Sequence, residues 1–149
     1  MTRNKKIIVY TDGGSRGNPG PSAVGVVVCD ELGKIVKEYN QVLEVSTNNE
    51  AEYEAVIFAL KKLKQLFGKE KTQRLEIEFR MDSQLIALQL GGEYKVNEER
   101  MQLLFMKVWN LKFDFKKVSF KSIPREQNKR ADELVNEALD GKGENGKLI

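Results

Sequence analysis

The sequence predicts an α/β fold in which helices pack on both faces of a mixed five-stranded sheet. Two observations predict it. Short β-branched segments separated by turn residues make up the first 45 residues, and segments with helical periodicity alternate with further strands from residue 49 onward. An antiparallel hairpin unit followed by alternating helices and strands is typical of a sheet that begins with three antiparallel strands and ends with parallel ones.

The first three predicted strands form an antiparallel meander. Residues 6–11 (KIIVYT) are a short β-branched run, and the Gly-, Ser-, Asn- and Pro-rich residues 13–21 are not expected to continue it. Residues 23–29 and 35–45 are two further strand candidates. The five residues between them include Gly33, which suits a hairpin connection.

A long helix is predicted over residues 49–67, because apolar side chains recur there at helical spacing. Thr47 and Glu50 are spaced as a capping box at its start. Alternating polar and apolar residues predict a half-buried strand over 74–80, and a short helix over 82–90 then ends at two glycines.

The last third of the chain adds two helices and one strand. Asn97 can cap a helix over residues 98–111, and Trp109 lies on its apolar stripe, so we expect Trp109 to pack in the core. A strand over 117–123 and an amphipathic helix over 128–139 complete the order βββαβααβα.

Length and composition suit one domain. The chain has 149 residues, of which 40% are hydrophobic, and we expect residues 1–140 to form a single domain and the Gly- and Lys-rich residues 141–149 a disordered tail. The formal charge of +3 suggests a polyanionic partner without establishing one. A monomer with no obligate protein partner is the default expectation.

Several kinds of chemistry and location are excluded or disfavoured by what the chain lacks. It contains no histidine, so a His-based triad, a His metal site and a His general base are excluded. Cys29 is the single cysteine and follows an apolar run, where a buried structural thiol is expected. No apolar stretch reaches the roughly 18 residues of a membrane helix, and the start of the chain does not resemble a signal peptide. We therefore expect a cytoplasmic protein that does not contact membranes.

Four carboxylates occupy positions that favour a functional site. Asp12 ends the first strand and Asp82 follows the fourth, at the strand ends where α/β sheets usually place ligands. Glu52 lies on the core-facing side of the long helix, where an unpaired carboxylate needs a cation or a place at the rim. Asp132 lies beside the apolar stripe of the last helix. Each acid alone could be a cap or turn residue, but the four together favour a shared role.

Oxygen ligands without His or Cys favour hard ions, Mg²⁺ or Mn²⁺. Two such ions about 4 Å apart can activate a water and stabilise the leaving oxygen of a phosphodiester, which removes the need for histidine. Metal-assisted phosphodiester hydrolysis is therefore the reaction class that these residues permit.

Four ordered segments, which span nearly the whole chain, resemble the signature blocks of the type 1 ribonuclease H family. The blocks are YTDGGSRGNPG at 10–20, STNNEAEYEAV at 46–56, MDSQL at 81–85 and NKRADELVNEA at 128–138. The resemblance implies a ribonuclease H-like fold and an endoribonuclease that cleaves the RNA strand of RNA–DNA hybrids with two Mg²⁺ or Mn²⁺ ions, leaving 5′-phosphate and 3′-hydroxyl ends. It also implies that the catalytic, metal-binding tetrad falls on Asp12, Glu52, Asp82 and Asp132.

The resemblance also implies a set of substrate contacts. Amide side chains would lie along the minor groove of the hybrid, where they can recognise 2′-hydroxyls, and a threonine would contact a DNA phosphate. Residues of the first loop would also touch the substrate. These residues are, in turn, Asn18, Asn48, Asn49 and Gln84 for the groove, Thr47 for the phosphate, and Ser15 and Arg16 for the loop. Helix capping alone could also explain the residues that precede the long helix.

The sequence departs from the family pattern in two places. Many members carry a histidine before the last catalytic aspartate, whereas Arg125 lies in that loop here. Our hypothesis is that Arg125 partly substitutes by contacting the scissile phosphate, although a guanidinium stays protonated and a solvated loop cation is the alternative. The segment 91–97 lacks the basic protrusion of some relatives, and this compact form resembles archaeal-type members, some of which also cut double-stranded RNA.

Three other functions are consistent with part of this pattern. A Holliday-junction resolvase or transposase core would share the carboxylates and metal but act on DNA, and the Thr-Asn-Asn and Asp-Ser-Gln segments favour reading 2′-hydroxyls instead. A silent hybrid-binding module would be expected to lack at least one of the four acids, all of which are present. A structural domain whose acids are caps does not explain their spacing.

Overall fold

A five-stranded sheet in the order β3-β2-β1-β4-β5 forms the centre of the protein. The computed structural model describes residues 5–141, so most of the predicted tail, 142–149, lies outside the described residues. The strands are β1 (Lys5–Ser15), β2 (Gly20–Cys29), β3 (Ile35–Ser46), β4 (Leu75–Met81) and β5 (Lys117–Ser122). The helices are α1 (Asn48–Phe67), α2 (Lys69–Thr72), α3 (Gln84–Leu90), α4 (Glu99–Lys112) and α5 (Lys129–Leu139), with a 3-10 turn η1 (Arg125–Gln127) before the last.

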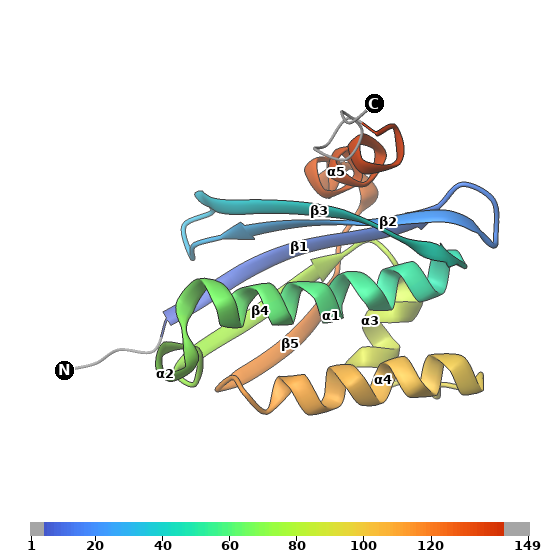
Figure 1. Cartoon of the computed structure of the whole chain (residues 1–149). Helices are drawn as coiled ribbons and strands as arrows, with labels where there is room; N and C mark the ends of the chain where they lie inside the picture. Colours follow the sequence, from blue (N-terminus) through green and yellow to red (C-terminus); the bar gives the residue numbers. More distant parts are fainter. Residues whose placement is uncertain (1–4, 142–149) are drawn as a thin grey trace.

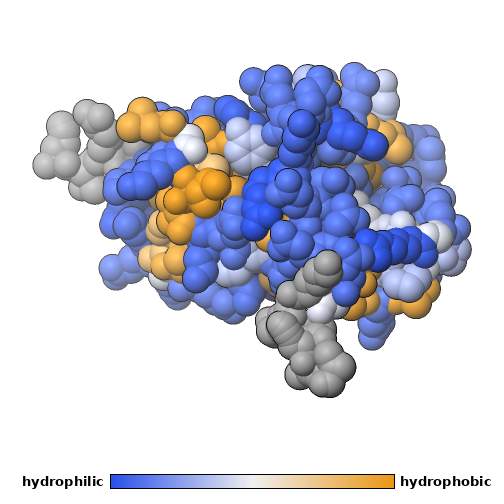
Figure 2. All heavy atoms as spheres, turned by 90° about the horizontal axis from the view of Figure 1, so that it is seen from above, coloured by the Kyte–Doolittle hydropathy of each residue, from blue (hydrophilic) through white to orange (hydrophobic). Residues whose placement is uncertain are grey.

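The predicted fold class is confirmed. β1, β2 and β3 are antiparallel neighbours, whereas β4 pairs in parallel with both β1 and β5. Helix α5 packs on one face over β1, β2 and β3, and α1 packs on the other face with α3 and α4 beyond it (Figure 1). The face that carries α5 is mostly hydrophilic, with a smaller apolar area to one side (Figure 2).

The two helical layers explain why β2 has a continuous apolar run instead of an alternating one. Strand β2 lies between α1 and α5, and from Ser22 to Cys29 every one of its residues is buried. The predicted buried thiol of Cys29 is confirmed. On the α1 side, Tyr53, Leu60 and Leu63 are fully buried against the sheet. The main core therefore lies between α1 and the sheet.

Helix α1 begins at the predicted capping box. The N–H of Glu50 donates to Thr47 Oγ1 at 3.1 Å, and the N–H of Thr47 donates to Glu50 Oε1 at 2.9 Å. These two bonds satisfy backbone donors that the first helical turn leaves free. They also fix where α1 starts, and with it the position of Glu52.

Three local predictions were wrong. Strand β1 does not end at Asp12 but continues to Ser15, because residues 12–15 remain paired with β2. Asn97 does not cap α4, whose N-cap position is held by Glu98 without a side-chain hydrogen bond. Trp109 is 42% exposed instead of packed in the core.

The position of Trp109 follows from the narrow contact between α4 and α1. Only Met101 and Val108 of α4 are buried, so the residue after Val108 lies at the edge of the contact. There the indole packs against the rings of Phe105 on its own helix and of Phe113 directly after the helix. No helix within residues 5–141 has the length and hydrophobicity needed to cross a membrane.

Candidate active site

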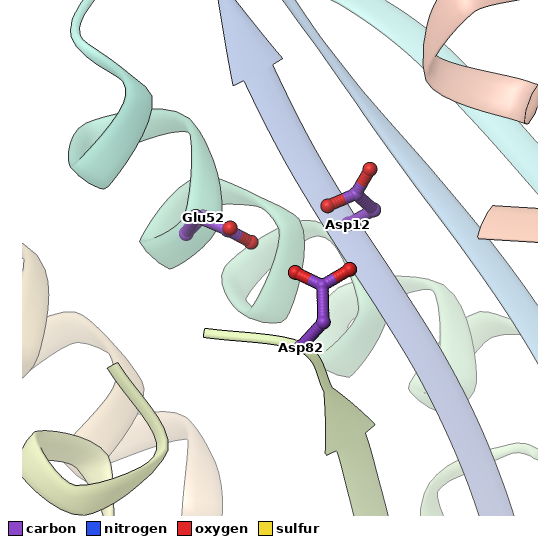
Figure 3. Close-up of side chains that lie close together, drawn as sticks. All are labelled: Asp12, Glu52 and Asp82. Carbon is purple, nitrogen blue, oxygen red and sulfur yellow. The ribbon is translucent and has the colours of Figure 1, made fainter. Parts of the chain in front are cut away.

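Three of the four predicted carboxylates converge at the carboxyl end of β4. Asp12 lies on β1, Glu52 near the start of α1, and Asp82 directly after β4. One oxygen from each lies within 4.8 Å of the other two. Figure 3 shows the three carboxylates pointing toward one another from these separate elements. Glu52 lies 40 residues after Asp12 in the chain, and Asp82 lies 30 residues after Glu52. The fold brings the three together into one acidic cluster.

The sheet and a glycine bring these acids together. The last residue pair between the parallel neighbours β1 and β4 is Tyr10 opposite Arg80, and Asp12 and Asp82 each follow this pair by two residues. Gly13 lies directly against α1, where a Cβ atom would overlap the carbonyl of Ala51. The N–H of Gly13 donates to Glu52 Oε1 at 3.2 Å. The glycine therefore allows the helix to approach the strand and orients the glutamate.

Burial and mutual repulsion make the ionised cluster unfavourable. Asp12 is only 7% exposed, and burial, together with the negative charges of Asp82 and Asp132, raises the pKa of Asp12 to about 8. Burial, followed by the charges of Asp12 and Asp82, raises the pKa of Glu52 well above its ordinary value. The Gly13 N–H and the positive charge of Arg125 partly oppose this rise in the pKa of Glu52. The cluster therefore needs either protons or a cation.

The donor set fits a hard divalent cation. Asp12, Glu52 and Asp82 offer only carboxylate oxygens, at a spacing at which a single ion could contact all three. Such an ion would supply the positive charge that the buried cluster lacks. The geometry supports the prediction of a metal site at these three residues, while the identity and number of ions stay predictions.

The acids lie in a cleft of about 460 Å³. Asp132, in the first turn of α5, is exposed and lines this cleft without belonging to the group of three. The cleft also brings together other residues that the sequence analysis selected. Those that line it are Asp12, Ser15, Arg16, Asn48, Glu52, Asp82, Arg125 and Asp132.

A small polar network joins the loop after β1 to the start of α1. Asn48 Oδ1 accepts hydrogen bonds from the N–H of Ser15 at 2.9 Å and from its hydroxyl at 3.2 Å. The N–H of Asn48 in turn donates to Asn18 Oδ1 at 2.9 Å. These contacts give the loop and helix a fixed mutual position beside the acids.

The remaining predicted substrate residues lie outside the cleft. Thr47 caps α1, Asn49 borders a separate hollow beside Gln89, and Gln84 is the exposed first residue of α3. The Asn18 side chain contacts Asn48 without lining the cleft. Their roles in substrate binding stay predictions.

Three polar residues of this region were not selected from the sequence. Ser83 and Asn136 line the cleft, and Asn136 Nδ2 donates to the backbone oxygen of Asp132 at 3.2 Å. Asn128 is buried behind the cleft and contacts Asp82. A signal was present, because Asn128, Asp132 and Asn136 are spaced by four residues and so share one side of a helix.

Comparisons with known proteins agree on one family. Residues 10–138 match the family described as reverse transcriptase-like. The chain is 41% identical over 138 residues to ribonuclease HI of Halobacterium salinarum, covering 93% of this chain and 66% of that protein. It is 48% identical to the structure of a ribonuclease H1 isolated from compost by a metagenomic approach, with a TM-score of 0.86 and coverage of 93% of this chain and 98% of that one.

A crystal structure of the compost enzyme in complex with an RNA/DNA hybrid is also similar, with 49% identity, a TM-score of 0.86, and coverage of 91% of this chain and 98% of that one. The chain spans less of other relatives. It matches 36% of the length of a bifunctional protein of Mycobacterium tuberculosis, at 34% identity over 91% of this chain. The chain thus spans only part of the length of the Halobacterium and Mycobacterium proteins.

Proposed function

Because the chain belongs to the type 1 ribonuclease H family, we propose that it is an endoribonuclease that hydrolyses the RNA strand of RNA–DNA hybrids. The observation that carries this proposal is the convergence of Asp12, Glu52 and Asp82 within 4.8 Å. The complex of the 49% identical compost enzyme with an RNA/DNA hybrid supports the choice of substrate. The products would carry 5′-phosphate and 3′-hydroxyl ends.

Asp12, Glu52 and Asp82, with Asp132 at the cleft rim, would hold two Mg²⁺ or Mn²⁺ ions. Such ions, when bound, lower the pKa of a water nucleophile and stabilise the leaving oxygen of a phosphodiester. The protein's own contribution is to keep carboxylate oxygens converging in a partly buried place, where charge interactions are strong. Asp132, exposed on α5 at the rim of the cleft, would meet an ion or substrate from the open side.

The network of Ser15, Asn18 and Asn48 would bind the hybrid beside the acids. Asn48 is exposed and lines the cleft, with its Oδ1 accepting from Ser15 and its Nδ2 available to donate. An amide held in this way can recognise a 2′-hydroxyl, the group that distinguishes RNA from DNA. Asn49, Gln84 and Thr47 would extend the contact surface outside the cleft.

Arg125 would bind the phosphate that is cleaved. It lines the same cleft, and its positive charge lowers the pKa values of both Asp12 and Glu52, which supports a position close to these acids. A guanidinium binds phosphate oxygens well but does not act as a general base. If Arg125→Ala leaves both turnover and hybrid affinity unchanged, this role is excluded.

The experiment that tests the function is cleavage of an end-labelled RNA–DNA hybrid beside matched RNA–RNA and DNA–DNA duplexes. Each would be incubated with Mg²⁺, Mn²⁺ or chelator, for the wild type and for Asp12→Asn. We expect metal-dependent cleavage of the RNA strand of the hybrid, lost in the variant. A folded wild type that binds hybrid but cuts no duplex would instead indicate a binding module. The RNA–RNA lane decides whether double-stranded RNA is a second substrate.

A further inference from the structure

Asn128 is a buried polar residue at the start of α5 whose side chain does not cap the helix. It occupies the N-cap of α5, where an asparagine usually accepts a hydrogen bond from the first helical turn. Its side chain makes no such bond, and the residue is only 1% exposed. The amide faces away from the helix, toward β1 and the end of β4.

The amide nitrogen joins β1, which carries Asp12, to Asp82 directly after β4. Asn128 Nδ2 donates to the backbone oxygen of Thr11 at 2.9 Å and to Asp82 Oδ2 at 3.4 Å. Thr11 directly precedes Asp12 on β1. One NH₂ group therefore fixes the distance between the backbone at Asp12 and the carboxylate of Asp82.

The backbone of Asn128 connects the other two segments of the site. Its N–H donates to the backbone oxygen of Arg125 at 2.9 Å, and its own backbone oxygen accepts from the N–H of Asp132 at 3.2 Å. The residue thus contacts the strand of Asp12, the side chain of Asp82, the turn of Arg125 and the helix of Asp132.

Within residues 5–141 the buried Oδ1 atom of Asn128 has no hydrogen-bond partner, which is unfavourable and uncommon in folded proteins. The need to satisfy buried polar groups therefore does not by itself explain why residue 128 is an asparagine. Turning the amide over would place Oδ1 against the carbonyl of Thr11 and the carboxylate of Asp82, which are both acceptors. The observed orientation therefore keeps both donors in use and leaves the acceptor unpaired.

We propose that Asn128 is a positioning residue for the metal site. Its amide holds the Asp82 carboxylate at a fixed place relative to β1, so that oxygens of Asp82, Asp12 and Glu52 stay close enough to share an ion. Groups that orient metal ligands typically change metal affinity or activity by about 10- to 100-fold when they are removed. The inference rests on the proposed metal-dependent function.

The test is a calorimetric titration of the 149-residue chain with Mn²⁺ for wild type, Asn128→Ala and Asn128→Ser. We expect Mn²⁺ affinity to fall about 10- to 100-fold in the alanine variant. The serine variant keeps one donor and should lie between it and wild type. Cleavage of hybrid by Asn128→Ala should recover in part at raised Mn²⁺, whereas its affinity for hybrid in chelator should match wild type.

Val28→Ala is the control for lost stability. Val28 is fully buried on β2 opposite Val9, three residues along β1 from Asp12, and is not part of the site. This variant should be less stable to denaturant yet bind Mn²⁺ as wild type does. An equal loss of affinity in Val28→Ala, or unchanged affinity in Asn128→Ala, would overturn the inference.

The remaining outcomes are also distinguishable. If Asn128→Ala does not fold, wild-type affinity in Asn128→Ser would overturn the inference, and an affinity reduced relative to wild type would support it. If the wild type itself binds no Mn²⁺, the proposed metal-dependent function fails, and the role of Asn128 fails with it. Wild-type binding with no effect at residue 128 rejects this inference alone.

Discussion

Arg16 forms an ion pair with Asp140 beside the cleft, with Nη1 2.7 Å from Oδ1. Arg16 Nη2 also donates to Asn136 Oδ1 at 3.3 Å. Both members of the ion pair are about half exposed, so it contributes little to stability, about 0–1 kcal/mol. Its main consequence is that Arg16, a predicted substrate contact, is held against the end of α5.

We therefore expect Asp140→Asn to bind the hybrid more tightly, because Arg16 is released to meet a phosphate. The gain should be roughly two- to fivefold in Kd at low salt, which corresponds to the strength of an exposed ion pair. Hybrid binding in chelator, followed by fluorescence anisotropy, measures it. Glu70→Gln makes the same charge change on α2, away from the cleft. An equal effect in both variants would show that net charge, and not Arg16, is responsible.

Gly13 and Gly14 provide a matched pair for the contact between α1 and β1. An alanine at 13 would overlap the backbone of Ala51, whereas an alanine at 14 would have Val135 Cγ1 as its nearest neighbour, at an ordinary 3.6 Å. We expect Gly13→Ala to lower the free energy of unfolding by about 1–3 kcal/mol or more and to displace Glu52. Gly14→Ala should stay within about 0.5 kcal/mol of wild type. Urea denaturation of both variants, compared with hybrid cleavage, distinguishes them.

Much of this architecture could be predicted from local patterns. The capping box of Thr47 and Glu50 marked the start of α1, and the apolar period of residues 49–67 marked its buried face. The expected strand-end positions of Asp12 and Asp82 indicated a shared site, although β1 continues past Asp12 to Ser15. Local signals sufficed for the start of α1 because helix caps depend on nearby residues.

The errors occurred where contacts distant in sequence decide the structure. The glycines after Asp12 remain in β1 because β2 pairs with them, and Gly13 is needed because α1 lies against it. Trp109 is exposed because α4 contacts α1 only through a narrow stripe, which periodicity alone does not show. The role of Asn128 depends on Thr11, 117 residues away.

The acidic cluster predicts an inverse relation between pH and stability in the metal-free protein. Burial and neighbouring charges raise the pKa of Asp12 from 3.8 to about 8. Between these values the folded chain holds a proton that the unfolded chain has released, so this residue's contribution to stability falls as pH rises from about 4 to 8.

Asp12→Asn cannot ionise, so in chelator it should be more stable than wild type at pH 8, by about 0.5–2 kcal/mol. The difference should shrink as the pH falls toward 4, which is close to the ordinary pKa of 3.8, because the unfolded wild-type chain then begins to keep the Asp12 proton as well. Thermal and urea unfolding between pH 4 and 9 test this, with Glu70→Gln as an exposed control. A constant difference across this range would contradict the raised pKa of Asp12.

The same protons should make metal binding dependent on pH. A divalent ion requires ionised carboxylates, yet below about pH 8 the metal-free site keeps a proton on Asp12. Binding must then displace this proton, so Mn²⁺ affinity should rise by up to about tenfold per pH unit for each proton released and level off above pH 8. Calorimetry in two buffers of different ionisation enthalpy counts the protons released at each pH. We expect release between pH 6 and 7.5 and little at pH 9. Equal affinity at pH 6 and 8, without proton release, would mean that Asp12 and its neighbours are already ionised in the free protein, and that a cation other than the bound metal balances the cluster.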